Sequence, residues 1–76
     1  MEYIDYIAGY CRDYRINTLK MTLAIMCEKT DTNVGTLSAF EHGRSKNIEH
    51  FIKYIEVSNN DQKLIFLSGF NKLMGV

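Results

Sequence analysis

The chain has 76 residues, which gives one domain, 1–76, with room for a single hydrophobic core but no deep substrate cleft. Its 46% hydrophobic and 24% charged residues are typical of a soluble globular protein and exclude a disordered or membrane-embedded one. Nine Lys plus Arg balance nine Asp plus Glu, so any contact with nucleic acid would depend on a local patch of charge rather than on net charge.

Five segments carry apolar residues at helical spacing and none alternates as a strand does, so we predict an all-α fold. The first helix is expected over residues 2–15. The second begins at Thr18 or Thr22 and ends at Lys29, and either threonine, or Asn17, would be its N-cap. The apolar stripes of these two helices are Tyr3, Ile4, Ile7, Cys11 and Tyr14, and Leu19, Leu23, Met26 and Cys27.

The third helix is expected over residues 33–42, after the polar break KTDTN, with Thr32 or Asn33 as its N-cap. Gly43 follows at the place where helices often end in a left-handed residue, a conformation that glycine adopts without steric cost. The apolar residues expected to point inward are Val34, Leu37 and Phe40.

The fourth helix is expected over residues 47–57 with Asn47 as its N-cap, and the polar stretch SNND ends it and caps the fifth, over residues 61–73. The stripe of the fourth helix is Ile48, Phe51, Ile52 and Ile55. The apolar residues of the fifth cover more than one face, which predicts two packing partners. They are Leu64, Ile65, Phe66, Leu67, Phe70 and Leu73.

The sequence also predicts a cytoplasmic protein with no membrane partner. The opening MEYIDYIAGY lacks the basic start and unbroken apolar stretch of a signal peptide, and no apolar run approaches the roughly 20 residues that span a bilayer. Cys11 and Cys27 are isolated within apolar patterns, so we expect two free, buried thiols and a reducing compartment.

The stretch LSAFEHGR, followed by SKN, resembles the end of the recognition helix in the Cro and phage-repressor (Xre-type) helix-turn-helix family. That helix commonly ends in an apolar-Ser-x-apolar-Glu-x-Gly pattern with basic residues next. The matching residues are Leu37, Ser38, Phe40, Glu41, Gly43 and Arg44. Counting back, Cys27 falls at the small residue of the first motif helix and Thr22 at its usual cap. The resemblance covers residues 12–55 and implies a compact five-helix, lambda-repressor-like domain.

The chain departs from the family pattern mainly in the turn. Asp31 stands where the family usually has Gly, and Thr30 and Thr32 replace apolar residues. The glutamine common at the start of the first motif helix is absent, and Asn47 replaces the usual Pro. A second register, in which Leu23-Ala24 matches the family's Leu-Ala pair, would require three extra residues in the turn.

Glu41 is expected to have a structural role, because the resemblance implies that it pairs with an Arg of the first helix. Arg15 or Arg12 is the candidate partner, and we favour Arg15 because it lies four residues after Cys11 on the buried side. Direct contact between Glu41 and DNA is the weaker interpretation, since phosphates repel a carboxylate.

The outer positions of the third helix are the candidate base-reading residues. They are Asn33, Gly35, Thr36, Ser38, Ala39 and His42. Asn suits bidentate contact with adenine, Ser and Thr suit bases or phosphate, and Ala suits a thymine methyl. Arg44 and Lys46 would meet phosphates, and Lys20, Lys29 and Lys53 are further candidates; an ordinary solvated polar face and scattered surface charge are the alternatives.

The sequence contains no catalytic or cofactor-binding motif, and His42 and His50 lack further ligands at metal-binding spacing. We therefore expect no enzyme activity, no metal and no cofactor. The surplus apolar residues of the last helix predict a dimer contact. Its members are Ile65, Phe66, Gly69 and Phe70.

Together these features predict a small, sequence-specific transcriptional regulator from a phage or another mobile element, which binds double-stranded DNA as a homodimer. The alternative is a protein-binding module with the same fold, such as a phage-encoded inhibitor of a host protein. Neutral net charge, a third helix without Arg or Lys, and the apolar last helix favour this alternative.

Overall fold

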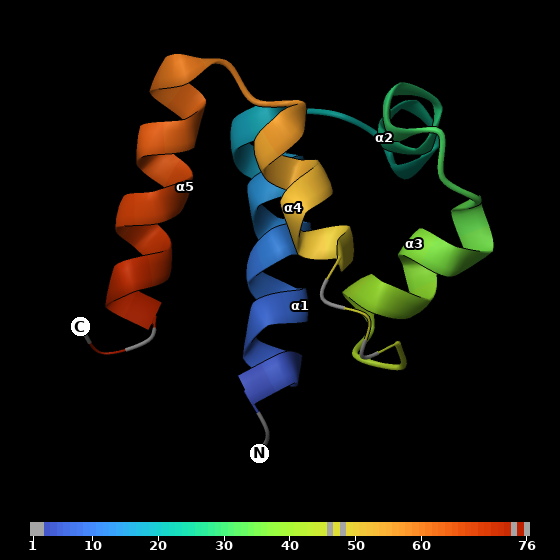
Figure 1. Ribbon diagram of the computed structural model, residues 1–76, viewed down its shortest axis with the longest axis horizontal. Helices are drawn as coiled ribbons and strands as arrows, with labels where there is room; N and C mark the ends of the chain where they lie inside the picture. The colour runs from blue at the N-terminus through green and yellow to red at the C-terminus, as the bar shows by residue number, and fades with distance from the viewer. Residues whose placement is uncertain (1–2, 46, 48, 74, 76) are drawn as a thin grey trace.

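The computed structural model describes residues 3–45, 47, 49–73 and 75, with side chains from Tyr6 onward. Within these residues the chain is all-helical and has no strand, as the sequence predicted. The helices are α1 (Tyr3–Tyr14), a π-helical turn η1 (Arg15–Leu19), α2 (Leu23–Thr30), α3 (Val34–Glu41), α4 (Glu49–Glu56) and α5 (Asn60–Leu73). Helix α1 is central and packs against α3, α4 and α5, while α2 and α3 form the edge opposite α5 (Figure 1).

Helix α1 continues directly into η1, so the first helical segment extends beyond Arg15 to Leu19. Lys20 ends this segment in a left-handed conformation, with φ of 54°. The N–H groups of Lys20 and Met21 both donate to the carbonyl of Arg15. The two bonds satisfy a carbonyl that the end of a helix would otherwise leave without a donor.

Capping side chains set the starts of the later helices. Thr22 caps α2, where its Oγ1 accepts a bond from the N–H three residues later at 3.2 Å; the other expected start, Thr18, is wrong, because Thr18 lies inside η1. At α5, Asn59 and Gln62 form a reciprocal capping box, in which each side chain accepts the other's backbone N–H at 2.8 Å. Gly43 follows α3 with φ of 75°, in the predicted left-handed conformation.

The core lies where α1 meets the other helices. Its fully buried side chains are Cys11, Met26, Leu37, Phe40, Tyr54 and Phe66. Cys11 and Cys27 are both buried, and burial raises the pKa of each thiol above its ordinary value. A neutral, enclosed thiol is a poor nucleophile, so both cysteines act as small hydrophobic residues, as the sequence predicted.

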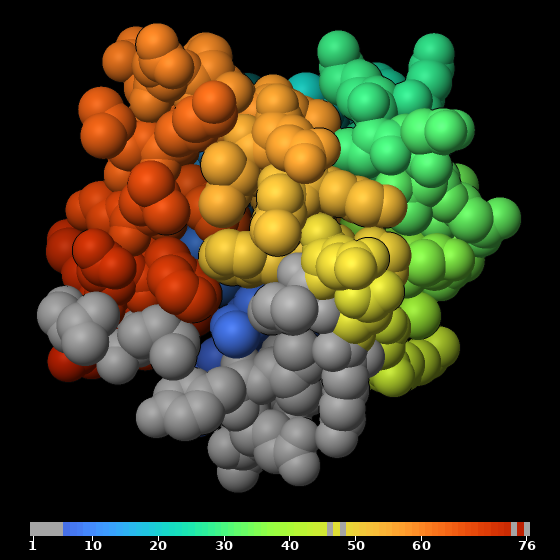
Figure 2. Space-filling view, viewed as in Figure 1, coloured from blue at the N-terminus to red at the C-terminus, as the bar shows by residue number. Residues whose placement is uncertain are grey.

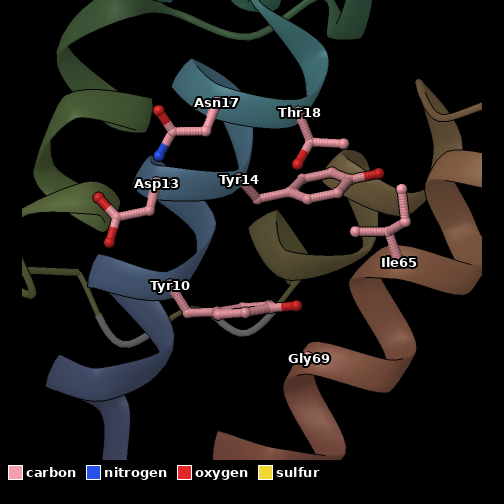
Figure 3. A pocket seen from close by; sticks show the side chains of 7 residues that line it. All are labelled: Tyr10, Asp13, Tyr14, Asn17, Thr18, Ile65 and Gly69. Carbon is pink, nitrogen blue, oxygen red and sulfur yellow. The ribbon is translucent and has the colours of Figure 1, made fainter.

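Two tyrosines of α1 point toward α5 and hold it in place (Figure 3). The hydroxyl of Tyr10 donates to the carbonyl of Phe66, and that of Tyr14 donates to the carbonyl of Gln62 at 3.0 Å. A Cβ on Gly69 would lie 2.5 Å from the Tyr10 hydroxyl, so this close approach requires glycine. A hollow of about 260 Å³ remains between α1–η1 and α5.

The dimer contact predicted on α5 is wrong in part. Phe66 is 0% exposed and belongs to the core, so it cannot meet a second protein. Gly69 lies against Tyr10, and Phe70 is half-buried between Tyr10 and Phe51. Only one of the predicted four, Ile65, is exposed among these described residues. The exposed apolar side chains of α5 are Leu64 (69%), Ile65 (55%), Leu67 (47%) and Leu73 (36%).

The inward face of α4 also differs from the predicted stripe. Ile52 is 51% exposed, whereas His50 and Tyr54 are buried. Phe51 and Ile55 are partly buried against the core, as predicted, and Ile48 lies outside the described residues. Figure 2 shows α4 between α5 on one side and α2–α3 on the other. Its aromatic side chains reach both neighbours, since Phe51 packs against Phe66 of α5 and Tyr54 against Phe40 of α3.

Candidate nucleic-acid interface

Helices α2 and α3 form a helix-turn-helix pair whose turn is closed by Asp31. Its φ of 52° and ψ of 48° are left-handed, although it is not glycine. The N–H of Asp31 donates to the carbonyl of Glu28, and that of Thr32 donates to the carbonyl of Cys27 at 2.9 Å, which completes a Schellman motif. The left-handed residue thus stands four positions after Cys27, where the resemblance placed the family's glycine. The register that used Leu23-Ala24 would instead put the turn at Glu28, which lies inside α2.

A chain of side-chain hydrogen bonds ties this turn to α4. The ammonium group of Lys53 donates to the hydroxyl of Thr32 at 2.7 Å. Thr32 lies 2.9 Å from the hydroxyl of Thr30, which donates to the carbonyl of Met26 at 2.8 Å. Lys53 therefore links α4 to the turn through one of its three N–H donors. The two threonines, which replace apolar residues of the family pattern, are the partners that make this link.

Glu41, the last residue of α3, binds α1–η1 and α4 together. Arg15 Nε lies 2.8 Å from Glu41 Oε2 and Arg15 Nη2 lies 2.9 Å from Oε1, so the predicted pair is bidentate. Tyr54 adds a third donor, with its hydroxyl 2.7 Å from Oε2. Arg15 and Glu41 are 7% and 5% exposed, whereas Arg12, the other candidate partner, is exposed.

The surroundings of Glu41 raise the pKa values of its two partners, Arg15 and Tyr54. The hydrogen bond to Glu41 raises the pKa of Arg15, and burial, followed by the bond to Glu41, raises the pKa of Tyr54. Arg15 also donates from Nη1 to the carbonyl of Met21 at 2.9 Å. A buried carboxylate with three donors is satisfied internally, which makes Glu41 a structural residue rather than a ligand for DNA.

Helix α3 buries one face and presents the other. Leu37 and Phe40 are fully buried, as predicted, but Val34 is 50% exposed rather than inward-facing. Val34 opens the helix, where α1 and α4 no longer cover it. The predicted base-reading positions fall into two groups: Gly35, Thr36 and His42 are exposed, and Ser38 and Ala39 are half-buried.

Asn33 is exposed but already committed to capping α3. Its Oδ1 accepts the N–H of Gly35 at 2.8 Å and of Thr36 at 3.4 Å. Bidentate contact with adenine needs that oxygen as an acceptor, so the predicted readout by Asn33 is wrong while the cap is intact. A Cβ on Gly35 would lie 3.1 Å from this oxygen, so the close approach of the capping side chain accounts for the glycine.

His42 and Arg44 extend the outer face beyond the helix. The Nδ1 of His42 donates to the carbonyl of Ser38 at 2.8 Å, which leaves Nε2 facing outward. The N–H groups of Arg44 and Ser45 both bond the carbonyl of Ala39, at 2.8 and 3.2 Å, and hold this segment against the end of α3. Arg44 is exposed there, and Lys46, its predicted companion, lies outside the described residues.

The charge around α2 and α3 is mixed. Lys20 and Lys29 are exposed, as the phosphate-binding prediction requires. Glu28 and Asp31, which flank Lys29 in sequence, are exposed too, and they offset its charge. The described cations therefore provide separate contact points rather than a broad positive surface.

Sequence reasoning missed His50 and Tyr54, the two buried polar residues of α4. The Phe40 ring packs against His50 at 5.5 Å, and within the described residues His50 Nδ1 has no hydrogen-bond partner. Burial, helped by Lys53, lowers the pKa of His50 from its ordinary 6.5. The sequence held one indication that Tyr54 is buried. A buried carboxylate such as that of Glu41 needs more hydrogen-bond donors than one arginine provides.

No family model, curated protein or solved structure matches this chain. Within the described residues, no group of three side chains is placed to hold a metal ion. No described helix has the length and apolar character needed to cross a membrane.

Proposed function

We propose that this protein is a small, cytoplasmic, sequence-specific DNA-binding regulator that acts as a homodimer and inserts α3 into the major groove. The observation that carries the proposal is the position of α3. It lies on the edge of the molecule (Figure 1), and the bonds of Glu41 to Arg15 and Tyr54 fix its end. An α-helix with its side chains is about 10–12 Å across, which matches the major groove, about 12 Å wide.

Small and polar side chains on the outer face suit close approach to base edges. Thr36 and Ser38 offer hydroxyl groups that can donate to or accept from bases. Val34, half-exposed at the start of the helix, can contact a thymine methyl, as can Ala39. The amide nitrogen of Asn33 remains a donor, because only its oxygen is used by the cap. Direct readout in this proposal rests mainly on Thr36 and Ser38.

Phosphate contacts come from a few cations at the ends of the motif. Arg44 follows α3, Lys20 precedes α2, and Lys29 lies in the last turn of α2. Each neutralised phosphate contributes about −0.9 to the slope of log K against log salt, so three contacts give a slope near −3. The proposal assigns no catalytic step and no cofactor.

The proposal can be tested by selecting duplexes from a random-sequence library at low salt and measuring their binding by fluorescence anisotropy. We expect an enriched motif and a clear loss of preference in the Thr36→Ala, Ser38→Ala variant. Tyr6→Phe, which removes an exposed hydroxyl group on α1, is the control and should bind like the unmodified protein. Absence of duplex binding at micromolar protein would rule out the proposal.

A second function, a protein-binding module, is favoured by one observation. The apolar side chains Leu64, Ile65 and Leu67 are exposed on α5, far from α3 (Figure 1). This module would bind a host protein and would not need DNA. Nuclease-treated pull-downs with the unmodified protein and a Leu64→Glu variant distinguish the two functions. A stoichiometric protein that is captured only by the unmodified chain would support this alternative, and recovery of nucleic acid alone would oppose it.

A further inference from the structure

We infer that α5 pairs with the α5 of a second copy in an antiparallel arrangement centred between Ile65 and Phe66. This inference rests on the homodimer of the proposed function and assigns its interface and register. The partner is argued from the pattern of exposed residues on α5. Every residue of α5 is described, so this pattern is complete for the helix.

One row of exposed residues on α5 reads the same in both directions. The row contains Asn60, Leu64, Leu67 and Asn71, all exposed, at intervals of four, three and four residues. An antiparallel copy reverses the order of the row and leaves it unchanged, as Asn-Leu-Leu-Asn. Leu64 of one chain then lies opposite Leu67 of the other, twice by symmetry. Polar residues at each end enclose the four leucines.

The neighbouring row supplies charge complementarity. It contains Asp61, Ile65, Ser68 and Lys72, again at intervals of four, three and four and all exposed. In the antiparallel pair, Asp61 of one copy lies about two residues, or roughly 3 Å along the axis, from Lys72 of the other. This distance is within the reach of a lysine side chain. A parallel pair would instead place Asp61 against Asp61 and Lys72 against Lys72, so the charges select the antiparallel orientation.

Ile65 lies at the edge of this arrangement, because its side chain also lines the hollow between α1–η1 and α5, beside Tyr14 and Gly69 (Figure 3). The leucine pairs therefore form the centre of the contact. The resulting apolar cluster contains Leu64, Ile65 and Leu67 from each chain, which are 69%, 55% and 47% exposed in the single chain. A second copy of the same helix therefore covers the most exposed apolar side chains of α5.

Cysteine cross-linking tests the register. Cys11 and Cys27 are buried, so an introduced cysteine would be the reactive thiol. An equimolar mixture of Leu64→Cys and Leu67→Cys chains should form a disulfide-linked dimer under mild oxidation, because the two positions lie opposite each other. Asn71→Cys is the control, because in the antiparallel pair its two copies lie roughly 16 Å apart along the axis and should not cross-link. Cross-linking of Asn71→Cys but not of the mixture would overturn the inference.

Charge exchange tests the orientation without oxidation. Asp61→Lys and Lys72→Asp each make both end contacts repulsive, so sedimentation equilibrium should show about tenfold weaker dimerisation for each. Mixing the two variants in equal amounts should restore the dimer, since every Asp then faces a Lys. Circular dichroism would show that each variant remains folded. Failure of the mixture to associate, or a monomeric unmodified chain at all micromolar concentrations, would overturn the inference.

These results separate the α5 dimer from the DNA-binding function. A monomer that still binds duplex through α3 would remove the α5 pair and leave the proposed DNA contact in place. A dimer with the predicted cross-link but no affinity for duplex would support the α5 pair and remove the proposed DNA contact.

Discussion

Arg15 and Glu41 form a buried, bidentate ion pair that joins the end of α1 to the end of α3, with nitrogen–oxygen distances of 2.8 and 2.9 Å. Tyr54 brings α4 to the same carboxylate. These contacts join segments that lie far apart in the sequence. The orientation of α3, on which the proposed DNA contact depends, is therefore set by residues outside the helix-turn-helix pair itself.

Removing one partner of this ion pair should strongly destabilise the folded protein. Glu41→Leu leaves the Arg15 guanidinium buried without its carboxylate, which costs about 3–5 kcal/mol in the free energy of unfolding. The double variant Arg15→Met, Glu41→Leu should recover much of that loss, because no unpaired charge remains. Urea unfolding of the single and double variants measures the coupling. Additive effects in this cycle would contradict a strong buried pair.

Tyr54→Phe isolates the third donor to Glu41. The ring and its packing remain, and one hydrogen bond to a charged group is lost, which should cost about 1.5–3 kcal/mol. Tyr6→Phe is the matched control, since Tyr6 is 46% exposed and its loss should change stability little. Thermal unfolding of both variants provides the comparison, and equal melting temperatures for the two would argue against the Tyr54–Glu41 bond.

Asp31→Gly should stabilise the protein by about 0.5–1 kcal/mol. Asp31 holds a left-handed conformation at the end of α2, which disfavours residues with a Cβ by about 1–2 kcal/mol, although glycine also gains entropy in the unfolded chain. Asp31→Val should destabilise, since a β-branched residue tolerates this conformation least. The midpoints of urea unfolding report both effects, and a lower midpoint for Asp31→Gly would be inconsistent with the observed turn.

Stability should fall on acidification because of His50. Burial lowers its pKa in the folded chain, so between the folded pKa and the ordinary value of 6.5 the unfolded chain binds more protons. The contribution is constant above about pH 6.5 and declines below it, by at most about 1.4 kcal/mol per pH unit. His50→Phe, which keeps an aromatic ring beside Phe40, should lessen this decline. Unfolding curves at about pH 7.5 and pH 5 for both chains test the sign, and an unchanged decline in the variant would contradict it.

Arg44→Ala and the double variant Thr36→Ala, Ser38→Ala should change DNA binding in different ways. Loss of Arg44 removes a phosphate contact, so affinity should fall for all duplexes and the salt slope should change by about 0.9. The double variant should change sequence preference while keeping the slope. Lys63→Ala is the control, a partly exposed cation on α5 away from α3 (Figure 1).

The helices and their order could be predicted from the sequence because apolar spacing and capping residues are local signals. The same holds for Gly43, and the resemblance pointed to Glu41 and Arg15 as a pair. Helical periodicity could not predict which apolar residues are buried, because that depends on how the helices pack. Val34 and Ile52 are apolar but exposed, since the neighbouring helices do not extend over them.

Other differences arose from tertiary contacts. Tyr54 turns inward and donates to Glu41, a long-range contact that helical periodicity does not reveal. Asn33 was expected to read bases, but its oxygen caps the start of α3. On α5 the two predicted packing partners are α1 and α4, because Phe66 and Phe70 each pack against Tyr10 of α1 and Phe51 of α4. The other apolar residues, Leu64, Ile65, Leu67 and Leu73, are exposed.

The most direct test of the central claim is an NMR titration of the isotopically labelled protein with the duplex enriched by selection, following the backbone amide signals. The account predicts that the largest shifts fall on Gly35, Thr36, Ser38 and Arg44, while amides of the α1–α5 contact stay unchanged. Shifts confined to α5, or no shifts at a saturating concentration of duplex, would contradict it.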